Sequence, residues 1–162
     1  MISFHTGIQA LRKFKVNSLN ERIQALIPDL ELIGTEYIHF IQSDKDLNQS
    51  NKKALYKLLD YAPEVNLVNS KHKITITPRI GTISPWSSKA TDICKLCGLS
   101  VVSRIERGIN YHFDRAVSAN ELATILELVM DKMTESVLND MNDSDLLFNE
   151  FMPNKFDTID IL

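Results

Sequence analysis

One order of secondary structure occurs twice along this chain, and that repetition limits the folds it can adopt. Within each half, apolar residues alternate as in a strand or recur at helical spacing, giving strand, helix, strand and helix. Phe40 and Phe113 end equivalent strands, and Ser50 and Ser118 begin equivalent helices. The predicted strands cover residues 2–5, 33–42, 72–77 and 101–113, and the predicted helices cover residues 17–28, 50–61, 85–97 and 118–133.

This pattern predicts an α+β fold, a duplicated unit whose mostly antiparallel sheet is covered on one face by helices. The predicted domain spans residues 1–138, with pseudo-repeats at about 1–62 and 72–134. Residues 139–162 are rich in Asn and Asp and are predicted to be a linker to a further module. Within this linker, a short docking helix is predicted from the apolar residues Leu146, Leu147, Phe148 and Phe151.

Composition favours a single globular domain. A chain of 162 residues buries roughly 70% of the surface that its unfolded form exposes. No apolar run approaches the ~20 residues that span a bilayer, and the N-terminus lacks the regions of a signal peptide. Two cysteines do not make a disulfide framework. We therefore expect a cytoplasmic, reduced setting without membrane contact.

Charge is distributed unevenly along the chain. Residues 78–115 carry 6 basic and 3 acidic side chains, whereas residues 116–162 carry 2 and 10. The isoelectric point near 5.8 argues against a nucleic-acid partner, since such proteins are usually strongly basic. The basic centre suits an acidic protein surface or a small anion.

The segment between Pro78 and Ile93 joins a predicted strand to a predicted helix and holds the single tryptophan. Ser84 suits the N-cap, and Pro85 suits the first helical position, where its missing N–H costs nothing. Gly98 predicts a left-handed cap at the end of this helix. The residues predicted to face inward from it are Trp86, Ala90, Ile93 and Cys97.

Two interpretations of this junction remain open. It is either an ordinary capped turn or an anion site, in which backbone N–H groups at the positive end of the helix hold a ligand. Arg79 and Lys89 would add positive charge to such a site.

Several short motifs along the chain occur in a familiar order. Residues 77–93 read TPRIGTISPWSSKATDI, and Cys97-Gly98-Leu99 and Arg104-Ile105-Glu106-Arg107-Gly108 follow. Glu36-Tyr37-Ile38-His39-Phe40 precedes this run and Leu146-Leu147-Phe148 comes after it. Together they resemble the N-terminal domain of the large single-chain phosphoribosylformylglycinamidine synthases of purine biosynthesis, over nearly the whole chain. Ile80 and the Cys94-Lys95 pair depart from the family pattern.

The resemblance implies a role within a larger enzyme that converts formylglycinamide ribonucleotide, glutamine and ATP to the amidine, glutamate, ADP and phosphate. ATP and magnesium would bind a synthetase module, and a Cys-His-Glu glutaminase would release ammonia. The N-terminal domain resembles the small accessory subunit of the multi-subunit enzyme, which bridges these activities. We expect the chain alone to be inactive, to bind no cofactor, and to contact the synthetase and glutaminase modules of the same polypeptide.

No catalytic residue is predicted in this chain. The residues expected at an interface or beside an ammonia channel are Arg79, Thr82, Ser84, Trp86, Ser87, Ser88, Lys89, Arg104 and Arg107. Alternation along a strand places Arg104 with Glu106 on one face and Arg107 on the other. These arginines are either solvated or bound to carboxylates of an adjoining domain. Trp86 is either core or interface anchor.

Other reactive residues favour structural roles. Cys94 and Cys97 form a C-x-x-C, but no second ligand pair accompanies them, so no metal site is predicted. Serines at a helix start are far more often caps than nucleophiles, which argues against a serine–lysine dyad with Lys89. His39 and His112 occupy matching strand positions and are interpreted as hydrogen-bonded structural residues.

Two other functions remain open from the sequence. The chain could be a free-standing regulatory module that binds a small anion at the helix start between Ser84 and Ser88, or a homomeric scaffold.

Overall fold

Side-chain caps set the starts of three of the α-helices in the described residues. In the computed structural model, which describes residues 1–61, 67 and 69–149, Asn48 caps α2 (Gln49–Leu58) and Ser84 caps α3 (Pro85–Leu96). Ser118 forms the predicted capping box with Glu121 at the start of α4 (Ala119–Val129). The caps predicted at Ser84 and Ser118 are confirmed. α1 (Lys13–Leu26) lacks a side-chain cap, so its start is not marked in the sequence.

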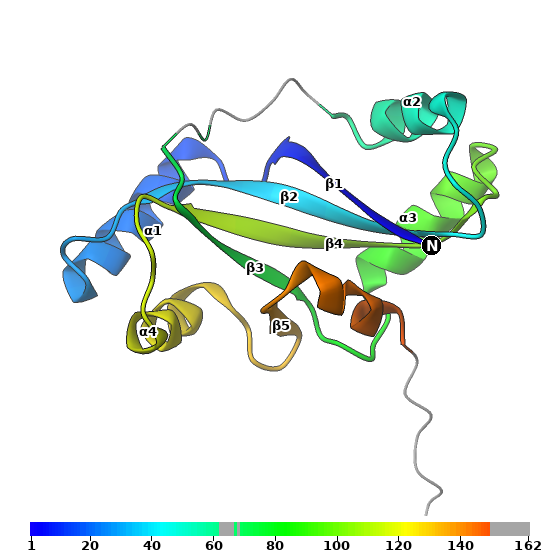
Figure 1. Cartoon of the computed structure of the whole chain (residues 1–162). Coiled ribbons are helices and arrows are strands. Elements are labelled where there is room, and N and C mark those ends of the chain that lie inside the picture. Colours follow the sequence, from blue (N-terminus) through cyan, green and yellow to red (C-terminus); the bar gives the residue numbers. More distant parts are fainter. Residues whose placement is uncertain (62–66, 68, 150–162) are drawn as a thin grey trace, which may run out of the picture.

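In the part of the chain that the structure describes, five strands form one open sheet, and every pairing in it is antiparallel. They are β1 (Ile2–Gln9), β2 (Leu32–Ser43), β3 (His72–Pro78), β4 (Val102–Phe113) and β5 (Glu135–Leu138). Their order across the sheet is β1-β2-β4-β3-β5 (Figure 1). The predicted α+β class and the repeated strand–helix–strand–helix order are confirmed. None of the helices in the described ranges is long and apolar enough to cross a bilayer.

β2 and β4 pair at the centre of the sheet and join the two halves of the chain. His39 lies opposite Arg107, and Phe40 lies opposite Glu106. Directly opposed residues point to the same side of a sheet. His39 and Arg107 therefore share one face of the sheet, and Phe40 and Glu106 share the opposite face. We call the first of these the helix-covered face, because the α-helices described below pack on it.

The four α-helices of the described residues lie over the helix-covered face in two pairs. α1 and α4 cover one end of the strands, and α2 and α3 cover the other (Figure 1). The first pair buries a cluster that contains Val16, Ile23, Ile74, Tyr111 and Ile125. The second pair buries a cluster that contains Ile41, Leu55, Cys94 and Ile105. Each pair combines one helix from each half, so neither half completes a core by itself.

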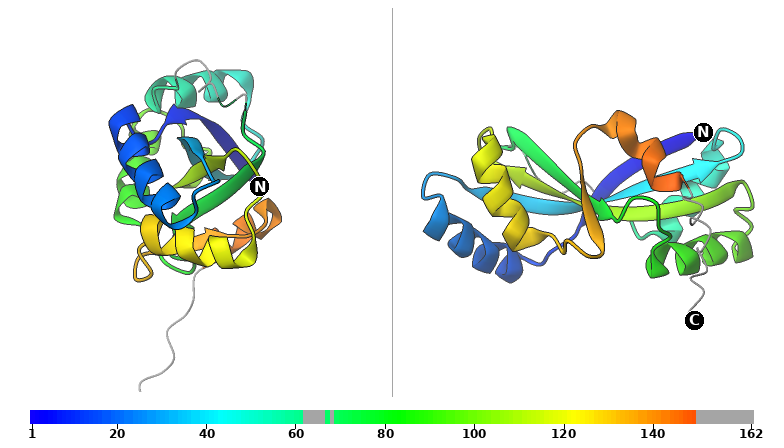
Figure 2. Two further views of the ribbon diagram at one scale, coloured as in Figure 1. Left: turned by 90° about the vertical axis from the view of Figure 1, so that its left-hand side faces the viewer. Right: turned by 90° about the horizontal axis from the view of Figure 1, so that it is seen from below.

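The opposite face is covered in part by a 3-10 helix, η1 (Met141–Phe148). Leu147 and Phe148 pack there against Ile38 and Phe40, and Figure 2 (right) shows η1 across the strands from α1 and α3. The short helix predicted in this segment therefore docks on the sheet of the same chain. Phe151 lies outside the described residues, and the linker role of residues 139–162 stays a prediction.

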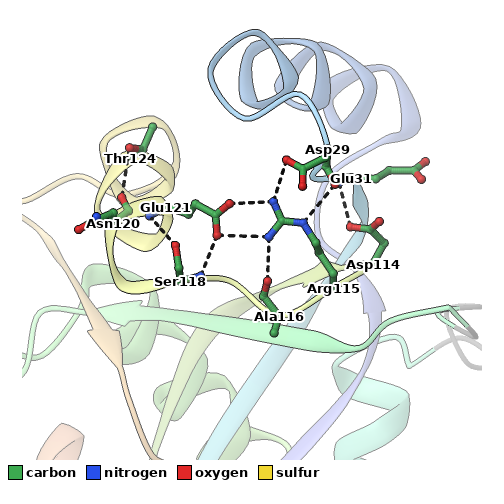
Figure 3. Close-up of polar contacts among 9 residues, drawn as sticks. All are labelled: Asp29, Glu31, Asp114, Arg115, Ala116, Ser118, Asn120, Glu121 and Thr124. Atoms are coloured by element: carbon green, nitrogen blue, oxygen red, sulfur yellow. Dashed lines mark hydrogen bonds and ion pairs between the residues drawn. The ribbon is translucent and has the colours of Figure 1, made fainter.

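A polar network ties the end of α1 to the start of α4 (Figure 3). The Arg115 guanidinium donates to Asp29 Oδ1 at 3.0 Å and to Glu121 Oε1 at 2.7 Å. Hydrogen bonds from Arg115 and from Ser118 lower the pKa of Glu121 to about 2. This network joins the two halves of the chain at the surface.

The structure corrects several predicted boundaries and faces. β1 continues to Gln9, α1 covers Lys13–Leu26 rather than 17–28, α4 ends at Val129, and β5 was not predicted. On α3, the residues that are buried are Ser87, Thr91 and Cys94. Ile93 is 47% exposed and Cys97 is exposed, so the predicted inward face is wrong for these two residues. The reason is that Thr91 turns toward β4, where its Oγ1 accepts from the N–H of Ile105 at 3.2 Å.

Candidate functional site

The nine predicted interface residues lie in three different surroundings. Thr82, Ser84 and Arg104 gather around Glu106 on the opposite face of the sheet. Trp86 and Arg107 lie together on the helix-covered face. The remaining residues belong to α3 and the loop before it: Arg79, Ser87, Ser88 and Lys89.

Glu106, which is 1% exposed, is the centre of the first group. Arg104 Nη2 donates to Glu106 Oε1 at 2.6 Å and to the carbonyl of Thr82 at 2.8 Å. Ser84 Oγ donates to Glu106 Oε2 at 2.8 Å, and the Arg104 guanidinium lies 5.3 Å from the centroid of the Phe148 ring. These bonds join the loop before α3 to β4 and η1. Thr82, Ser84 and Arg104 therefore stabilise the domain itself.

The same carboxylate occupies the start of α3. The backbone N–H of Ser84 donates to Glu106 Oε1 at 3.3 Å, and Ser84 Oγ accepts from the N–H of Ser87 at 3.0 Å. A negative charge is favourable at a helix N-terminus, and here the chain supplies it. The structure thus supports the capped turn, and the anion-site interpretation lacks its binding position. Ser87 Oγ is buried and has no hydrogen-bond partner among the described residues.

On the helix-covered face, the Arg107 guanidinium lies between two aromatic rings. Its Cζ is 4.4 Å from the Tyr37 centroid and 4.6 Å from the Trp86 centroid, both within cation–π range. The His39 ring lies 5.5 Å from the Trp86 ring. The predicted separation of Arg107 from Arg104 and Glu106 onto different faces is confirmed. Trp86 is half-buried against the core and also lines a cavity, and its role as an interface anchor stays a prediction.

His39 is held in one orientation by Tyr61. His39 Nδ1 is 2.7 Å from the Tyr61 hydroxyl, which donates its proton to the carbonyl of His5 at 3.0 Å. Nδ1 must then be the protonated nitrogen, which leaves the lone pair on Nε2. Burial, with Arg107 nearby, lowers the pKa of His39 to about 3, so the ring is neutral at physiological pH. The predicted structural, hydrogen-bonded role of His39 is confirmed.

A second buried histidine belongs to a network that the sequence reveals only in part. His112 Nε2 lies 3.0 Å from Glu36 Oε1, and His112 Nδ1 lies 2.9 Å from Ser70 Oγ. Asn110 also donates to Glu36 Oε1 at 3.1 Å. Burial opposes ionisation of Glu36, but the hydrogen bonds from His112 and Asn110 outweigh it and lower the pKa of this carboxyl. Strand alternation predicts that these residues share a face; Ser70 is brought to them only by the fold.

The exposed candidates belong to α3 and to the loop before it, which together we call the outer surface of α3. Arg79, Thr82, Ser88 and Lys89 are exposed. Arg79 has one long bond from its guanidinium, 3.4 Å to the carbonyl of Met133. Apolar side chains accompany them: Ile83 is 50% exposed, Ile93 47% and Leu96 87%. This outer surface of α3 combines basic and apolar groups, as protein interfaces do.

The two cysteines have different surroundings. Cys94 is buried and Cys97 is exposed, and both are free thiols. Burial, then the neighbouring Cys97, raises the pKa of Cys94. In the part of the chain that the structure describes, no three His, Cys, Asp or Glu side chains are grouped to hold a metal ion.

One comparison with known proteins identifies a relationship. The family model described as formylglycinamide ribonucleotide amidotransferase N-terminal matches residues 36–148. This match runs from β2 to η1 and covers more than half of the 162-residue chain. It contains β4, α3 and the loop between β3 and α3, and hence all nine predicted interface residues.

Proposed function

Because the chain belongs to the formylglycinamide ribonucleotide amidotransferase N-terminal family, we propose that it is a non-catalytic domain of that purine-biosynthesis enzyme. It holds the synthetase and glutaminase modules in register, so that ammonia released from glutamine reaches formylglycinamide ribonucleotide without being protonated in bulk water. The family match carries this proposal. ATP and magnesium would bind the synthetase module, and the whole enzyme would act in the cytoplasm.

The outer surface of α3 is the part of the domain that we assign to module contacts. Its exposed candidates Arg79 and Lys89 provide positive charge, and Ile93 and Leu96 provide apolar area. By contrast, Arg104 already has an internal carboxylate partner. The assignment therefore rests on exposed side chains that form no ion pair among the described residues.

Alanine substitutions of Arg79 and Lys89 test this assignment. In the isolated chain, the double variant should change the free energy of unfolding by no more than about 0.5 kcal/mol, because both residues are exposed. In the full-length enzyme it should uncouple glutamine hydrolysis from amidine formation. The ammonia-dependent reaction should change less, since added ammonia does not need the channel. The isolated chain should show no synthase, glutaminase or ATPase activity.

A matched control uses two exposed lysines on other helices, Lys15 on α1 and Lys53 on α2. Their double alanine variant should leave coupling unchanged. If the Arg79 and Lys89 variant couples as well as the wild type, the assignment of the outer surface of α3 fails. If it unfolds the isolated chain, the two residues are structural.

A further inference from the structure

A cavity of about 530 Å³ opens on the helix-covered face between α2, α3 and the sheet. This volume lies within the range of small-molecule sites, roughly 300–1,000 Å³. Its apolar lining consists of Ile8, Leu58, Leu59, Ala90, Ile93 and Cys94. Its aromatic and polar lining consists of Tyr37, His39, Trp86, Lys89 and Arg107. A largely apolar wall with a few convergent polar groups is typical of ligand sites.

Arg107 is a half-buried cation in this lining. Among the described residues, no carboxylate lies within ion-pair distance of its guanidinium and no hydrogen-bond acceptor is bound to it. Enclosing a cation without a counter-charge is unfavourable, and the rings of Tyr37 and Trp86 compensate only in part. The same rings restrict where the guanidinium can lie, because its Cζ is 4.4 Å from the Tyr37 centroid and 4.6 Å from the Trp86 centroid. The fork of N–H donors is thus pre-organised for a planar anion.

The charge of the cavity is set by two cations. Lys89 on α3 and Arg107 on β4 are positive, and His39 is neutral because burial lowers its pKa to about 3. A phosphate dianion usually gathers several backbone N–H groups or cations, and the apolar walls formed by Leu58 and Ile93 do not offer them. A singly charged planar group on an apolar body fits this combination better.

We propose that this cavity is a binding site for a small monocarboxylic acid with a branched or cyclic apolar body. The carboxylate accepts two parallel hydrogen bonds from Arg107 and is attracted by Lys89. The apolar body packs against Leu58, Leu59 and Ile93. Lys89 and Ile93 belong to both this cavity and the outer surface of α3, whereas Arg107 belongs to the cavity alone, so substitutions of Arg107 test this site separately from the module contacts proposed above.

Trp86 is the single tryptophan of the chain and lines the cavity, so its fluorescence reports on binding directly. The probe is cyclohexanecarboxylate, which is titrated into the 162-residue chain at constant ionic strength. Cyclohexanecarboxamide serves as the neutral isostere, and inorganic phosphate serves as the alternative anion. We expect a saturable change in Trp86 emission with the carboxylate, at least tenfold weaker binding of the carboxamide, and no response to phosphate. The carboxylate should also raise the thermal unfolding midpoint, as a ligand of the folded state does.

Substitutions at the cavity separate charge from shape. Arg107→Gln should weaken carboxylate binding at least tenfold and leave carboxamide binding unchanged. Arg107→Lys should retain only part of the wild-type affinity for the carboxylate, because lysine cannot donate a planar pair of hydrogen bonds. Lys89→Gln should weaken binding less. Lys95→Gln, an exposed lysine on the same helix, is the control and should bind as the wild type does.

If the carboxylate and the carboxamide bind equally, the cavity does not recognise charge and the proposal is wrong. A lack of response to either probe in the folded chain, with the Trp86 indole resonance of a nuclear magnetic resonance spectrum unmoved, would also overturn it. In that case we would expect Arg107 to pair with an acidic side chain of another module. Failure here leaves the test of module coupling with Arg79 and Lys89 intact.

Discussion

At the scale of the residue, burial decides the charge of His39. Its side chain is 2% exposed, and the Tyr61 hydroxyl holds it as the neutral Nδ1–H tautomer. Because the pKa of His39 is lowered from 6.5 to about 3, the folded protein stays unprotonated at this ring where the unfolded chain takes up a proton. The contribution of His39 to the free energy of unfolding is therefore fully present above pH 6.5, and it is lost progressively as the pH falls below 6.5 toward the folded pKa.

We predict that His39 lowers the free energy of unfolding by about 2 kcal/mol when the pH changes from 7.5 to 5.0. The lower pH is about 1.5 units below the pKa of this histidine in the unfolded chain. Urea unfolding at the two pH values measures it. In His39→Gln the difference between the two pH values should shrink by about this amount. His5 and Glu36, whose pKa values are also lowered in the fold, titrate in the wild type and in the variant alike, so the difference between the two proteins isolates His39. An unchanged difference in the variant would show that His39 is protonated in the fold.

The thiols at the two ends of the C-x-x-C differ in exposure, and burial also raises the pKa of Cys94. Cys97 is exposed and Cys94 is 1% exposed with a raised pKa. Since the thiolate is the reactive form, the native chain should react with Ellman's reagent rapidly at one thiol and at the second only after unfolding. Cys97→Ser should abolish the rapid phase and Cys94→Ser should retain it. Two equally rapid thiols would contradict the burial of Cys94.

At the scale of the element, the two serines that cap α3 and α4 differ in the partners of their side chains. Ser118 is exposed and bonds only within the capping box of α4. Ser84 caps α3 and also donates to the buried carboxylate of Glu106. Loss of a cap costs about 1 kcal/mol, and a buried acceptor that loses a donor adds about 1–3 kcal/mol.

We therefore predict that Ser84→Ala destabilises the chain by about 2 kcal/mol or more and Ser118→Ala by about 1 kcal/mol. Denaturant titration of both variants measures the difference. Ser84→Thr keeps the hydroxyl and should recover most of the loss. Equal costs for the two alanine variants would mean that Glu106 does not depend on the Ser84 hydroxyl.

At the scale of the whole molecule, the two halves share their cores. α1 packs with α4 and α2 packs with α3, and β2 pairs with β4 across the middle of the sheet. A fragment of residues 1–61 would expose the apolar faces of α1, α2 and β2. We predict that this fragment does not form a folded monomer and shows no cooperative thermal transition by circular dichroism. A cooperative monomeric transition would show that each half has its own core.

Local signals in the sequence determined the order of elements and much of the site. The caps at Ser84 and Ser118, the positive φ of Gly98 and the alternation that separates Glu106 from Arg107 all depend on neighbouring residues. Such short-range patterns are visible without a fold, because capping and strand alternation act over one to four positions. The motif run from Thr77 to Ile93 likewise pointed to the family that the match over residues 36–148 shows.

Tertiary structure decided which of these residues are free to act. Glu106 fills the start of α3 and binds Arg104, which also binds the carbonyl of Thr82, so three predicted interface residues (Thr82, Ser84 and Arg104) stabilise the domain itself. Arg107, of the same type and three positions away, lies instead between Tyr37 and Trp86 at a cavity. Alternation along β4 places the two arginines on different faces, but it does not show what each one meets there, because Thr82, Phe148, Tyr37 and Trp86 come from other parts of the chain. The sequence thus determined which side chains each element presents, and the packing of distant elements decided which charges are paired, because burial and pairing depend on contacts across the fold.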